Sequence, residues 1–290
     1  MNPQILTVII VMLSLITSII LALVYTYFGA TKLPNNNPSK YLKRKIPSKK
    51  SKRNIVLIGD SITHGRVGKN YVELLAERLD DEQFELINAG INSELAYNVL
   101  QRLDDIINCK PDIVTILIGT NDANGSFTPK NQKFYTKRMK LPQYPTSEWY
   151  EENLKSIITQ LQLETKAQIA VLSLPTIGEI SNHPAFMQSI KYSKIIQNVA
   201  RKTGACYLAL NERMASYLKE HPTNPKYPYE KHRLEMYKAI ARYYLFRESW
   251  DQIAANKGFN LHIDYLHLNS VGAMMVVDLI EQFVIYGKAD

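Results

Sequence analysis

The sequence predicts an α/β protein in which one N-terminal transmembrane helix precedes a single three-layer α/β/α domain around a five-stranded parallel sheet. Two observations support this fold class. Five short apolar runs alternate with stretches of helical periodicity, which is typical of a parallel sheet covered by helices on both faces. Before them, the first 29 residues contain no charged side chain. The chain has 290 residues, of which 46% are hydrophobic, and this length allows one substantial domain with appendages.

The first element is the apolar run over residues 5–29, which begins ILTVIIVML. At about 1.5 Å per residue, a helix of this length crosses a hydrocarbon core of roughly 30 Å. Tyr25, Tyr27 and Phe28 cluster at its far end, where aromatic side chains favour the membrane interface. A cleaved signal peptide is the alternative, but the run exceeds the usual apolar region of ~7–15 residues, and no Lys or Arg precedes it. We therefore predict a retained single-pass membrane anchor over residues 1–31.

A basic linker, residues 32–53, follows the anchor and carries the charge excess of the chain. Residues 1–53 contain nine Lys or Arg and no acidic residue, which leaves 26 basic and 27 acidic residues in the remainder. Because residues 54–290 are thus near neutral, we expect no nucleic-acid partner. The Pro, Asn, Ser and Lys content predicts an extended, solvated tether. Positive charge after the helix favours a cytoplasmic catalytic domain, with an extracytoplasmic domain as the alternative.

The remaining residues, 54–290, are predicted to form the α/β domain. The predicted strands lie at residues 54–58, 85–88, 112–118, 168–172 and 206–210. The predicted helices lie at residues 71–79, 95–107, 147–163, 186–202 and 271–285. Two segments interrupt this alternation: residues 123–146 are loop-like and basic, and residues 221–258 combine prolines with a Tyr- and Arg-rich helical stretch. Such insertions often shape a substrate mouth, although a solvated loop and a packing helix explain them equally well.

Polar motifs stand where predicted strands end, which is where active sites of parallel sheets form. Gly59-Asp60-Ser61 follows the first strand. A serine at a strand-to-helix turn exposes its hydroxyl, and its backbone amide lies at a helix N-terminus, where developing negative charge is stabilised. An ordinary N-cap serine explains this motif alone equally well.

Two further motifs follow the same rule. Asn121, within Gly119-Thr120-Asn121-Asp122 after the third strand, can aim an amide N–H at an oxyanion, although Asn also favours ordinary turns. Near the C-terminus, Asp264 stands three residues before His267, ahead of an apolar helix. An Asp so placed can accept a hydrogen bond from one ring nitrogen of the His and leave the other facing a serine. Taken alone, the pair also suits a surface turn that caps the last helix.

In this order, the motifs resemble those of the GDSL/SGNH hydrolase family over residues 54–286. The matching blocks are Gly59-Asp60-Ser61, Asn88-Ala89-Gly90 with Leu100-Gln101-Arg102-Leu103 after it, Gly119-Thr120-Asn121-Asp122, and Asp264-Tyr265-Leu266-His267. Ser93 departs from the pattern, because many members have a second glycine there. Segments 123–146 and 221–258 match nothing in the family pattern, which leaves the substrate open.

The resemblance implies a flavodoxin-like sheet and a Ser–His–Asp triad of Ser61, His267 and Asp264. It also implies an oxyanion hole made of the Ser61 and Gly90 backbone amides and the Asn121 side chain, with no metal or other cofactor. The expected function is that of a membrane-anchored serine hydrolase, an esterase, lipase or lysophospholipase-like enzyme. It would cleave or transfer the acyl group of a lipid or acetylated-sugar ester. A histidine base with an ordinary pKa near ~6.5 predicts activity that rises from mildly acid to neutral pH.

Two other function classes fit parts of the sequence. A metallophosphoesterase would use metal-competent side chains, and the chain has several of them near the motifs: Asp60, Asn121, Asp122, Asp264 and His267. Against it, the first strand carries no Asp-x-His, and His-rich ligand motifs are missing. The second alternative is a catalytically inactive, membrane-tethered binding module on the same scaffold, because a fold alone does not establish activity. Covalent labelling of Ser61 by a fluorophosphonate separates the enzyme from the binding module.

Overall fold

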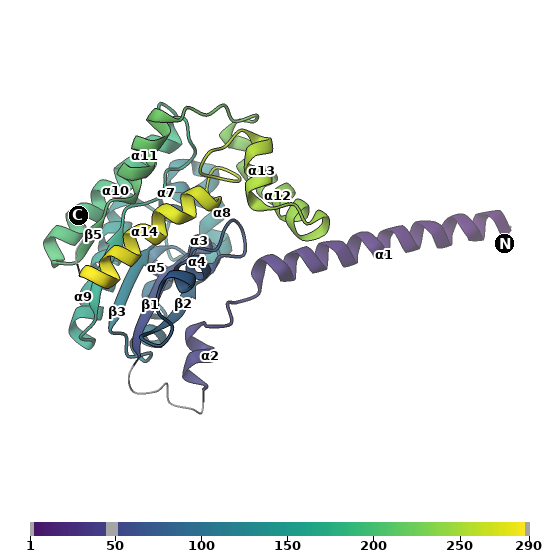
Figure 1. Ribbon diagram of the computed structural model, residues 1–290. Helices are drawn as coiled ribbons and strands as arrows, with labels where there is room; N and C mark the ends of the chain where they lie inside the picture. The colour runs from purple at the N-terminus through teal and green to yellow at the C-terminus, as the bar shows by residue number, and fades with distance from the viewer. Residues whose placement is uncertain (1–2, 45–51, 288–290) are drawn as a thin grey trace.

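The computed structural model describes residues 3–44 and 52–287 and shows one α/β domain from whose side a long N-terminal helix projects (Figure 1). Five parallel strands form a sheet in the order β2-β1-β3-β4-β5. The strands are β1 Arg53–Gly59, β2 Phe84–Gly90, β3 Ile113–Leu117, β4 Gln168–Leu172 and β5 Cys206–Leu208. Each lies where an apolar run predicted it, so the predicted fold class is confirmed.

Helices cover both faces of the sheet. One face carries α5 Ala96–Leu100, α6 Leu103–Ile107, α9 Ser147–Glu164 and α10 Pro184–Thr203, and the other carries α4 Tyr71–Arg78, α11 Leu210–Glu220 and α14 Ser270–Tyr286. Figure 1 shows α14 lying across the front of the sheet. The alternation of side chains along β1 explains the two layers: Val56 and Ile58 enter one core, whereas Ile55 and Leu57 enter the other. A strand buried on both faces is apolar at every position, as the run at residues 55–58 is.

The two interrupting segments are helical. They contain α7 Thr120–Phe127 and α8 Pro129–Met139, then the 3-10 turn η1 Tyr229–Lys231, α12 His232–Phe246 and α13 Trp250–Lys257. The prediction that residues 123–146 are loop-like is therefore wrong, whereas the helical stretch within 221–258 is confirmed. The start of α8 has a local cause. Thr128 accepts a hydrogen bond from the Asn131 N–H (3.1 Å) as N-cap, and Pro129 occupies the first helical turn.

Residues 95–107, expected as one helix, form the two short helices α5 and α6. The break falls at Arg102, whose backbone (φ −123°, ψ 21°) leaves the helical region. Its guanidinium turns inward to the Glu94 carboxylate and to the Ala89 carbonyl oxygen. A buried charge that must reach a specific partner thus overrides the continuous apolar pattern of the segment.

The helix at the N-terminus, α1 Pro3–Thr31, is long and apolar enough to cross a membrane, with a mean hydropathy of 2.8 in its most apolar window. Its side chains are exposed over most of its length, but Thr26 and Ala30 near its end are buried against the domain. We call residues 22–31 the foot of α1.

The linker differs from its prediction. Residues 32–44 pack on the domain instead of forming a solvated tether, and they include the short helix α2 Pro38–Leu42. Asn36 attaches this segment to the domain, because it hydrogen-bonds to the outer edge of β2. Its carbonyl oxygen accepts from the Asn88 N–H and its side chain donates to the Leu86 carbonyl, both at 3.0 Å. The later part of the predicted linker, residues 45–51, lies outside the described residues.

Candidate active site

Ser61 and the pair Asp264 and His267, some 200 residues later in the sequence, come together at the carboxyl end of the sheet. Ser61 is the first residue of the four-residue helix α3 Ser61–His64, directly after β1 and the N-cap Asp60. Ser61 Oγ lies 2.9 Å from His267 Nε2, and His267 Nδ1 lies 2.7 Å from Asp264 Oδ2. Ser61 is half-buried, whereas the other two side chains are buried. This continuous chain of hydrogen bonds can move a proton away from the serine hydroxyl.

The loop before α14 gives Asp264 and His267 their positions. Asp264 Oδ1 accepts from the backbone N–H groups of Leu266 (3.1 Å) and His267 (2.8 Å), which closes a tight turn. Tyr265 within this turn has φ 83°, and its carbonyl oxygen accepts from the Gly178 N–H at 2.8 Å. A non-glycine residue at such φ costs on the order of 1–3 kcal/mol, so the surrounding bonds must hold the turn in place.

A second buried carboxylate supports the same loop from the other side. Glu179 accepts from the backbone N–H groups of Asn260, Leu261 and His262, at 2.7–2.8 Å. Its Oε1 also lies 2.9 Å from His262 Nδ1. The loop is therefore held by two carboxylates, Glu179 at its start and Asp264 at its centre. The sequence gives no signal for the role of Glu179, because this residue follows β4 and lies about 80 residues from the loop that it supports.

The electrostatics of the pair Asp264 and His267 favour the charged imidazolium. Burial lowers the pKa of His267, but the charge and the hydrogen bond of Asp264 outweigh it, so the pKa lies above its ordinary value. For Asp264, burial raises the pKa, but the His267 charge and the hydrogen bonds to its carboxylate prevail and leave the pKa below its ordinary value. Asp264 is thus an anion that stabilises the imidazolium.

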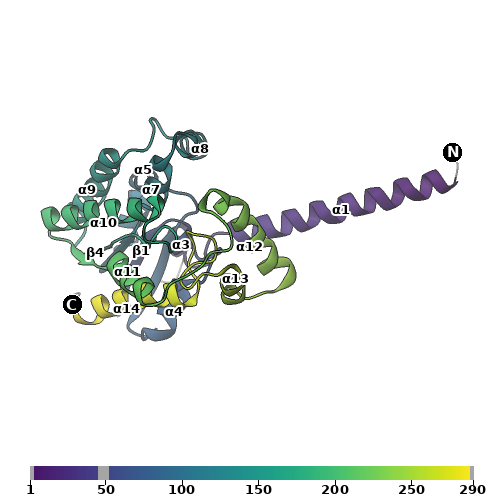
Figure 2. The same cartoon turned by 90° about the horizontal axis from the view of Figure 1, so that it is seen from above.

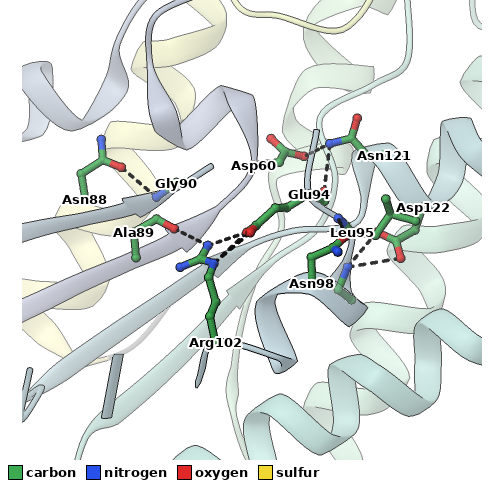
Figure 3. A network of polar contacts seen from close by, with 11 residues as sticks. Asp60, Asn88, Ala89, Gly90, Glu94, Leu95, Asn98, Arg102, Asn121 and Asp122 are labelled. Carbon is green, nitrogen blue, oxygen red and sulfur yellow. Dashed lines mark hydrogen bonds and ion pairs between the residues drawn. The ribbon is translucent and has the colours of Figure 1, made fainter. Parts of the chain in front are cut away.

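The other predicted donors lie close by but already have partners within the protein. Gly90, the last residue of β2, donates its N–H to Asn88 Oδ1 at 2.9 Å. Asn121, in the first turn of α7, donates from Nδ2 to Asp60 Oδ2 (3.2 Å) and to the Glu94 carbonyl oxygen (3.0 Å). Figure 3 shows both arrangements, with the Asn121 amide nitrogen pointing at Asp60. The Ser61 N–H stands at the first position of α3, ahead of the bonds within that helix.

A chain of hydrogen-bonded side chains from both interrupting segments ends at the side-chain oxygen of Asn121. Tyr135 of α8 donates from Oη to Asn121 Oδ1 at 2.9 Å, and Asn124 Nδ2 donates to the same tyrosine oxygen at 3.1 Å. Tyr229 of η1 donates in turn to Asn124 Oδ1. All four side chains are buried. The sequence gives no signal for this chain of hydrogen bonds beyond the helix start at Thr128-Pro129, because its members are brought together only by tertiary packing.

Several buried carboxyl groups surround the same region, and burial raises the pKa of each. Burial raises the pKa of Asp60 to about 6 and that of Asp122 to about 8. Glu94 is paired with Arg102, which donates to it at 2.6–3.0 Å, yet burial still raises the pKa of Glu94. Figure 3 shows that Glu94 connects Arg102 with Asn121: its carboxylate accepts from the Arg102 guanidinium, and its backbone carbonyl accepts from the Asn121 amide.

The backbone requires glycine at position 90, the last residue of β2, and would also accommodate it at position 93. At Gly90, an added Cβ would lie 2.2 Å from the His64 backbone nitrogen, so α3 can approach β2 only because no side chain is there. Ser93, the departure from the family pattern, has φ 67°, a left-handed conformation that glycine adopts without strain. Its Oγ accepts from Arg138 Nε of α8 at 3.2 Å.

A cavity of about 190 Å³ lies beside the loop that carries Asp264 and His267. Its lining includes Gly178, His183, Tyr229 and Tyr265, but neither Ser61 nor His267.

Within the described residues, no group of three or more His, Cys, Asp or Glu side chains is arranged to hold a metal ion.

Comparison with known proteins extends these observations. The sequence model described as the GDSL-like Lipase/Acylhydrolase family matches residues 57–273. Among solved structures, Axe2, an acetylxylan esterase from Geobacillus stearothermophilus, is 19% identical, with a TM-score of 0.56 over 82% of this chain and 95% of that one.

Two further structures have the same fold. The acetyl xylan esterase AlAXEase is 23% identical, with a TM-score of 0.57 over 80% of this chain and 99% of that one. LAE5, an alpha/beta hydrolase enzyme from the metagenome of Lake Arreo, Spain, is 19% identical, with a TM-score of 0.53 over 81% and 95%. At these identities the likeness establishes a shared fold. No curated protein matches the sequence.

Proposed function

The chain belongs to the GDSL-like lipase/acylhydrolase family, whose members hydrolyse ester bonds, and from this premise we propose that it is a membrane-anchored serine esterase with Ser61 as its nucleophile. The family match agrees with the resemblance read from the motifs. The observation that carries the proposal is the hydrogen-bonded chain from Ser61 through His267 to Asp264, at 2.9 and 2.7 Å.

The proposed reaction proceeds through an acyl-enzyme. Ser61 Oγ attacks the acyl carbon while His267 Nε2 takes its proton, and the resulting imidazolium returns that proton to the departing alkoxide. Water then attacks the acyl-enzyme, giving up its proton to His267, and Ser61 regains a proton as the carboxylic acid leaves. Asp264 holds Nδ1–H toward itself, which keeps Nε2 free to act as the base.

Charge on the tetrahedral intermediate requires donors near Ser61. We assign this role to the backbone N–H groups of Ser61 and Gly90 and to the Asn121 amide. Within the protein, the Gly90 and Asn121 donors bond to Asn88, Asp60 and the Glu94 carbonyl. An oxyanion would compete with these partners, and the long Asn121–Asp60 contact of 3.2 Å is the weakest of them.

The anchor proposal rests on α1. Apart from its length and apolarity, its foot is integrated into the domain, since the Ala30 carbonyl accepts from Asn92 Nδ2 at 2.9 Å. Cleavage near residue 30, as in a signal peptide, would remove this contact. The positive residues after α1 favour a cytoplasmic position for the catalytic domain.

Two substrate classes fit the proposal, a lipid ester and an acetylated sugar. Two of the named structural relatives are acetylxylan esterases, which suggests the short acetyl group, whereas an anchor near a bilayer suits a lysophospholipid. The test uses the full chain in detergent, with Ser61→Ala beside it, on p-nitrophenyl esters of increasing chain length, acetylated xylooligosaccharides and lysophosphatidylcholine.

We expect turnover that Ser61→Ala abolishes, and the preferred chain length separates the two classes. Covalent labelling of Ser61 by a fluorophosphonate checks the nucleophile independently of substrate choice. A Ser61→Ala protein that retains wild-type turnover would overturn the proposed mechanism.

A further inference from the structure

The foot of α1 is held in one direction by close contacts with the domain. Its inward face consists of the small residues Ala22, Thr26, Gly29 and Ala30, which recur at helical spacing and are buried or half-buried. Tyr244 of α12 fills the space beside them, and its Oη lies 2.8 Å from the Gly29 carbonyl oxygen. A Cβ on Gly29 would lie 2.5 Å from the Tyr244 ring. The small face therefore permits a close helix contact that sets how α1 leaves the domain.

The helix that receives the foot also carries an apolar stripe on its outer side. Leu234, Tyr237 and Leu245 of α12 are 53%, 60% and 41% exposed. Their spacing, with Ala241 between them, places them along one face of the helix. The opposite face is buried and includes His232 and Ala239. Because only one face of α12 packs on the domain, the apolar side chains of the outer face have no partner inside it. An exposed apolar patch of this kind marks an interaction surface.

The outer stripe of α12 continues directly onto α1. Tyr244 lies two turns after Tyr237 on the same side of α12, and its ring meets that of Tyr25 edge-on, with centroids 6.4 Å apart. Tyr25 lies at the end of the uncharged run of α1. In both Figure 1 and Figure 2, α12 lies on the side of the domain from which α1 projects. A membrane crossed by α1 would therefore face the stripe.

We propose that α12 is an interfacial helix, with Leu234, Tyr237 and Leu245 in contact with the lipids of the membrane that α1 crosses. This inference rests on the proposed anchor. The composition at the contact agrees with a lipid surface, because the exposed cations Lys32 and Arg247 flank the aromatic end of α1 and the end of α12, respectively, where anionic headgroups would attract them.

This placement has a consequence for the candidate site. Tyr244 Oη also lies 2.9 Å from the Arg66 carbonyl oxygen, and Asn92 holds the Ala30 carbonyl. These residues belong to the loops that follow α3 and β2, which carry Ser61 and Gly90. The edge of the sheet that holds the site is thereby kept beside the bilayer instead of swinging freely on a tether.

The test measures lipid contact in the full chain reconstituted into vesicles of phosphatidylcholine and phosphatidylglycerol. The variants Tyr237→Cys and Leu245→Cys are made in a Cys206→Ser background, in which the buried Cys109 is the one native cysteine left. The introduced cysteine carries an environment-sensitive fluorophore, and lipids with a spin label on the acyl chain quench it. Ile16→Cys within α1 serves as the positive control. Leu163→Cys at the end of α9, 80% exposed, is the matched control away from the stripe.

We expect the labels at positions 16, 237 and 245 to be quenched at least about twofold more than the label at position 163, because interfacial helices bury their apolar face in the acyl boundary. If position 16 is not quenched, the anchor proposal itself fails. If position 16 is quenched but 237 and 245 behave like 163, the inference about α12 is overturned while the anchor stands. Labels on α12 that are shielded from water yet not quenched by lipid would indicate a protein partner and would also overturn it.

Discussion

The two sides of the candidate site differ in where their hydrogen bonds go. On the Ser61 side, Ser61, His267 and Asp264 bond to one another in a line that ends at the reactive hydroxyl. On the Asn121 side, the donors of Gly90 and Asn121 bond to oxygens of the protein itself. The first side is ready to accept a proton without rearrangement. In the proposed mechanism, the second must exchange one partner for another when charge develops on a substrate.

This difference follows from what each side must do without a ligand. A buried N–H without a partner costs about 1–3 kcal/mol, so the proposed oxyanion donors need acceptors within the protein before an oxyanion forms. Asp60 and the Glu94 carbonyl serve as acceptors for Asn121. The Ser61 side has no such requirement, because its groups satisfy one another. The predictions below test whether the two sides contribute as differently as their geometry indicates.

The largest effect is expected on the Ser61 side. Asp264→Asn would leave the fold intact but remove the anion that stabilises the His267 imidazolium and selects its tautomer. We expect kcat to fall by about 10⁴-fold. Steady-state kinetics on the best p-nitrophenyl ester would measure this, with circular dichroism as the control for folding. A loss below about tenfold would mean that the Asp264–His267 contact is structural only.

A smaller loss is expected on the Asn121 side. Asn121→Ala would remove one oxyanion donor, which typically lowers kcat by about 10²–10³-fold, or roughly 3–4 kcal/mol. Because its amide already has protein partners, we expect the lower end of that range. An unchanged KM with a reduced kcat would indicate a transition-state role. Wild-type kcat in this variant would show that Asn121 only satisfies Asp60 and Glu94.

The pH dependence of kcat/KM tests whether Asp60, which bonds to Asn121, also influences the pKa of His267. His267 must be neutral to act as base, so kcat/KM falls about tenfold per pH unit below its pKa. Since that pKa is raised, largely by Asp264 against the opposing effect of burial, the midpoint should lie above the ordinary ~6.5. The charge of Asp60 also raises the pKa of His267, so Asp60→Asn should shift the midpoint downward. A wild-type midpoint at or below 6.5 would contradict this prediction.

Tyr135→Phe probes how Asn121 is oriented. The variant loses the hydroxyl that donates to Asn121 Oδ1, and one neutral hydrogen bond of about 0.5–1.5 kcal/mol corresponds to a decrease in kcat of roughly 3–10-fold. Tyr192→Phe is the matched control, because Tyr192 is equally buried but bonds to Ser126. In an Asn121→Ala background the Tyr135→Phe effect should disappear. Equal effects in both backgrounds would assign Tyr135 a purely structural role.

The smallest effect is expected at Ser93, beside the Glu94 carbonyl that receives the Asn121 amide. Ser93→Gly relieves a left-handed conformation but increases the freedom of the unfolded chain, and these contributions nearly cancel. We expect the free energy of unfolding to change by less than about 1 kcal/mol, as measured by chemical denaturation, with kcat unchanged. A large drop in kcat would mean that strain at Ser93 helps to aim the Glu94 carbonyl.

The Ser61 side could be predicted from the sequence because each of its groups carries a local signal. The apolar run of β1 ends at Gly59, and the Asp264–His267 spacing closes within one turn. The predicted positions of all five strands are confirmed for a similar reason, since buried parallel strands are apolar at nearly every position.

The Asn121 side and the insertions could not be predicted in the same way. Tyr135 and Tyr229 are 94 residues apart in the numbering, and only tertiary packing connects them through Asn124. The sequence of α7 includes Asn124 and Gly125, which disfavour helices, so its helix depends on packing rather than on propensity. The docking of residues 32–44 could not be predicted either, because their polar composition is typical of a solvated tether. Asparagine can also hydrogen-bond to the open edge of a strand, as Asn36 does, and proline can begin a helix, as Pro38 does.

Asn36 has a further consequence for how this protein behaves outside a membrane. β2 is the outermost strand on its side of the sheet, and Asn36 occupies the backbone groups of Leu86 and Asn88 on its open edge. A shortened chain that began at residue 54 would present these groups to other molecules, and bare strand edges recruit further strands and promote aggregation. A chain cut just after α1 would keep Asn36, which covers this edge and prevents strand pairing with other molecules. The choice of starting residue would therefore decide whether the soluble domain stays monodisperse.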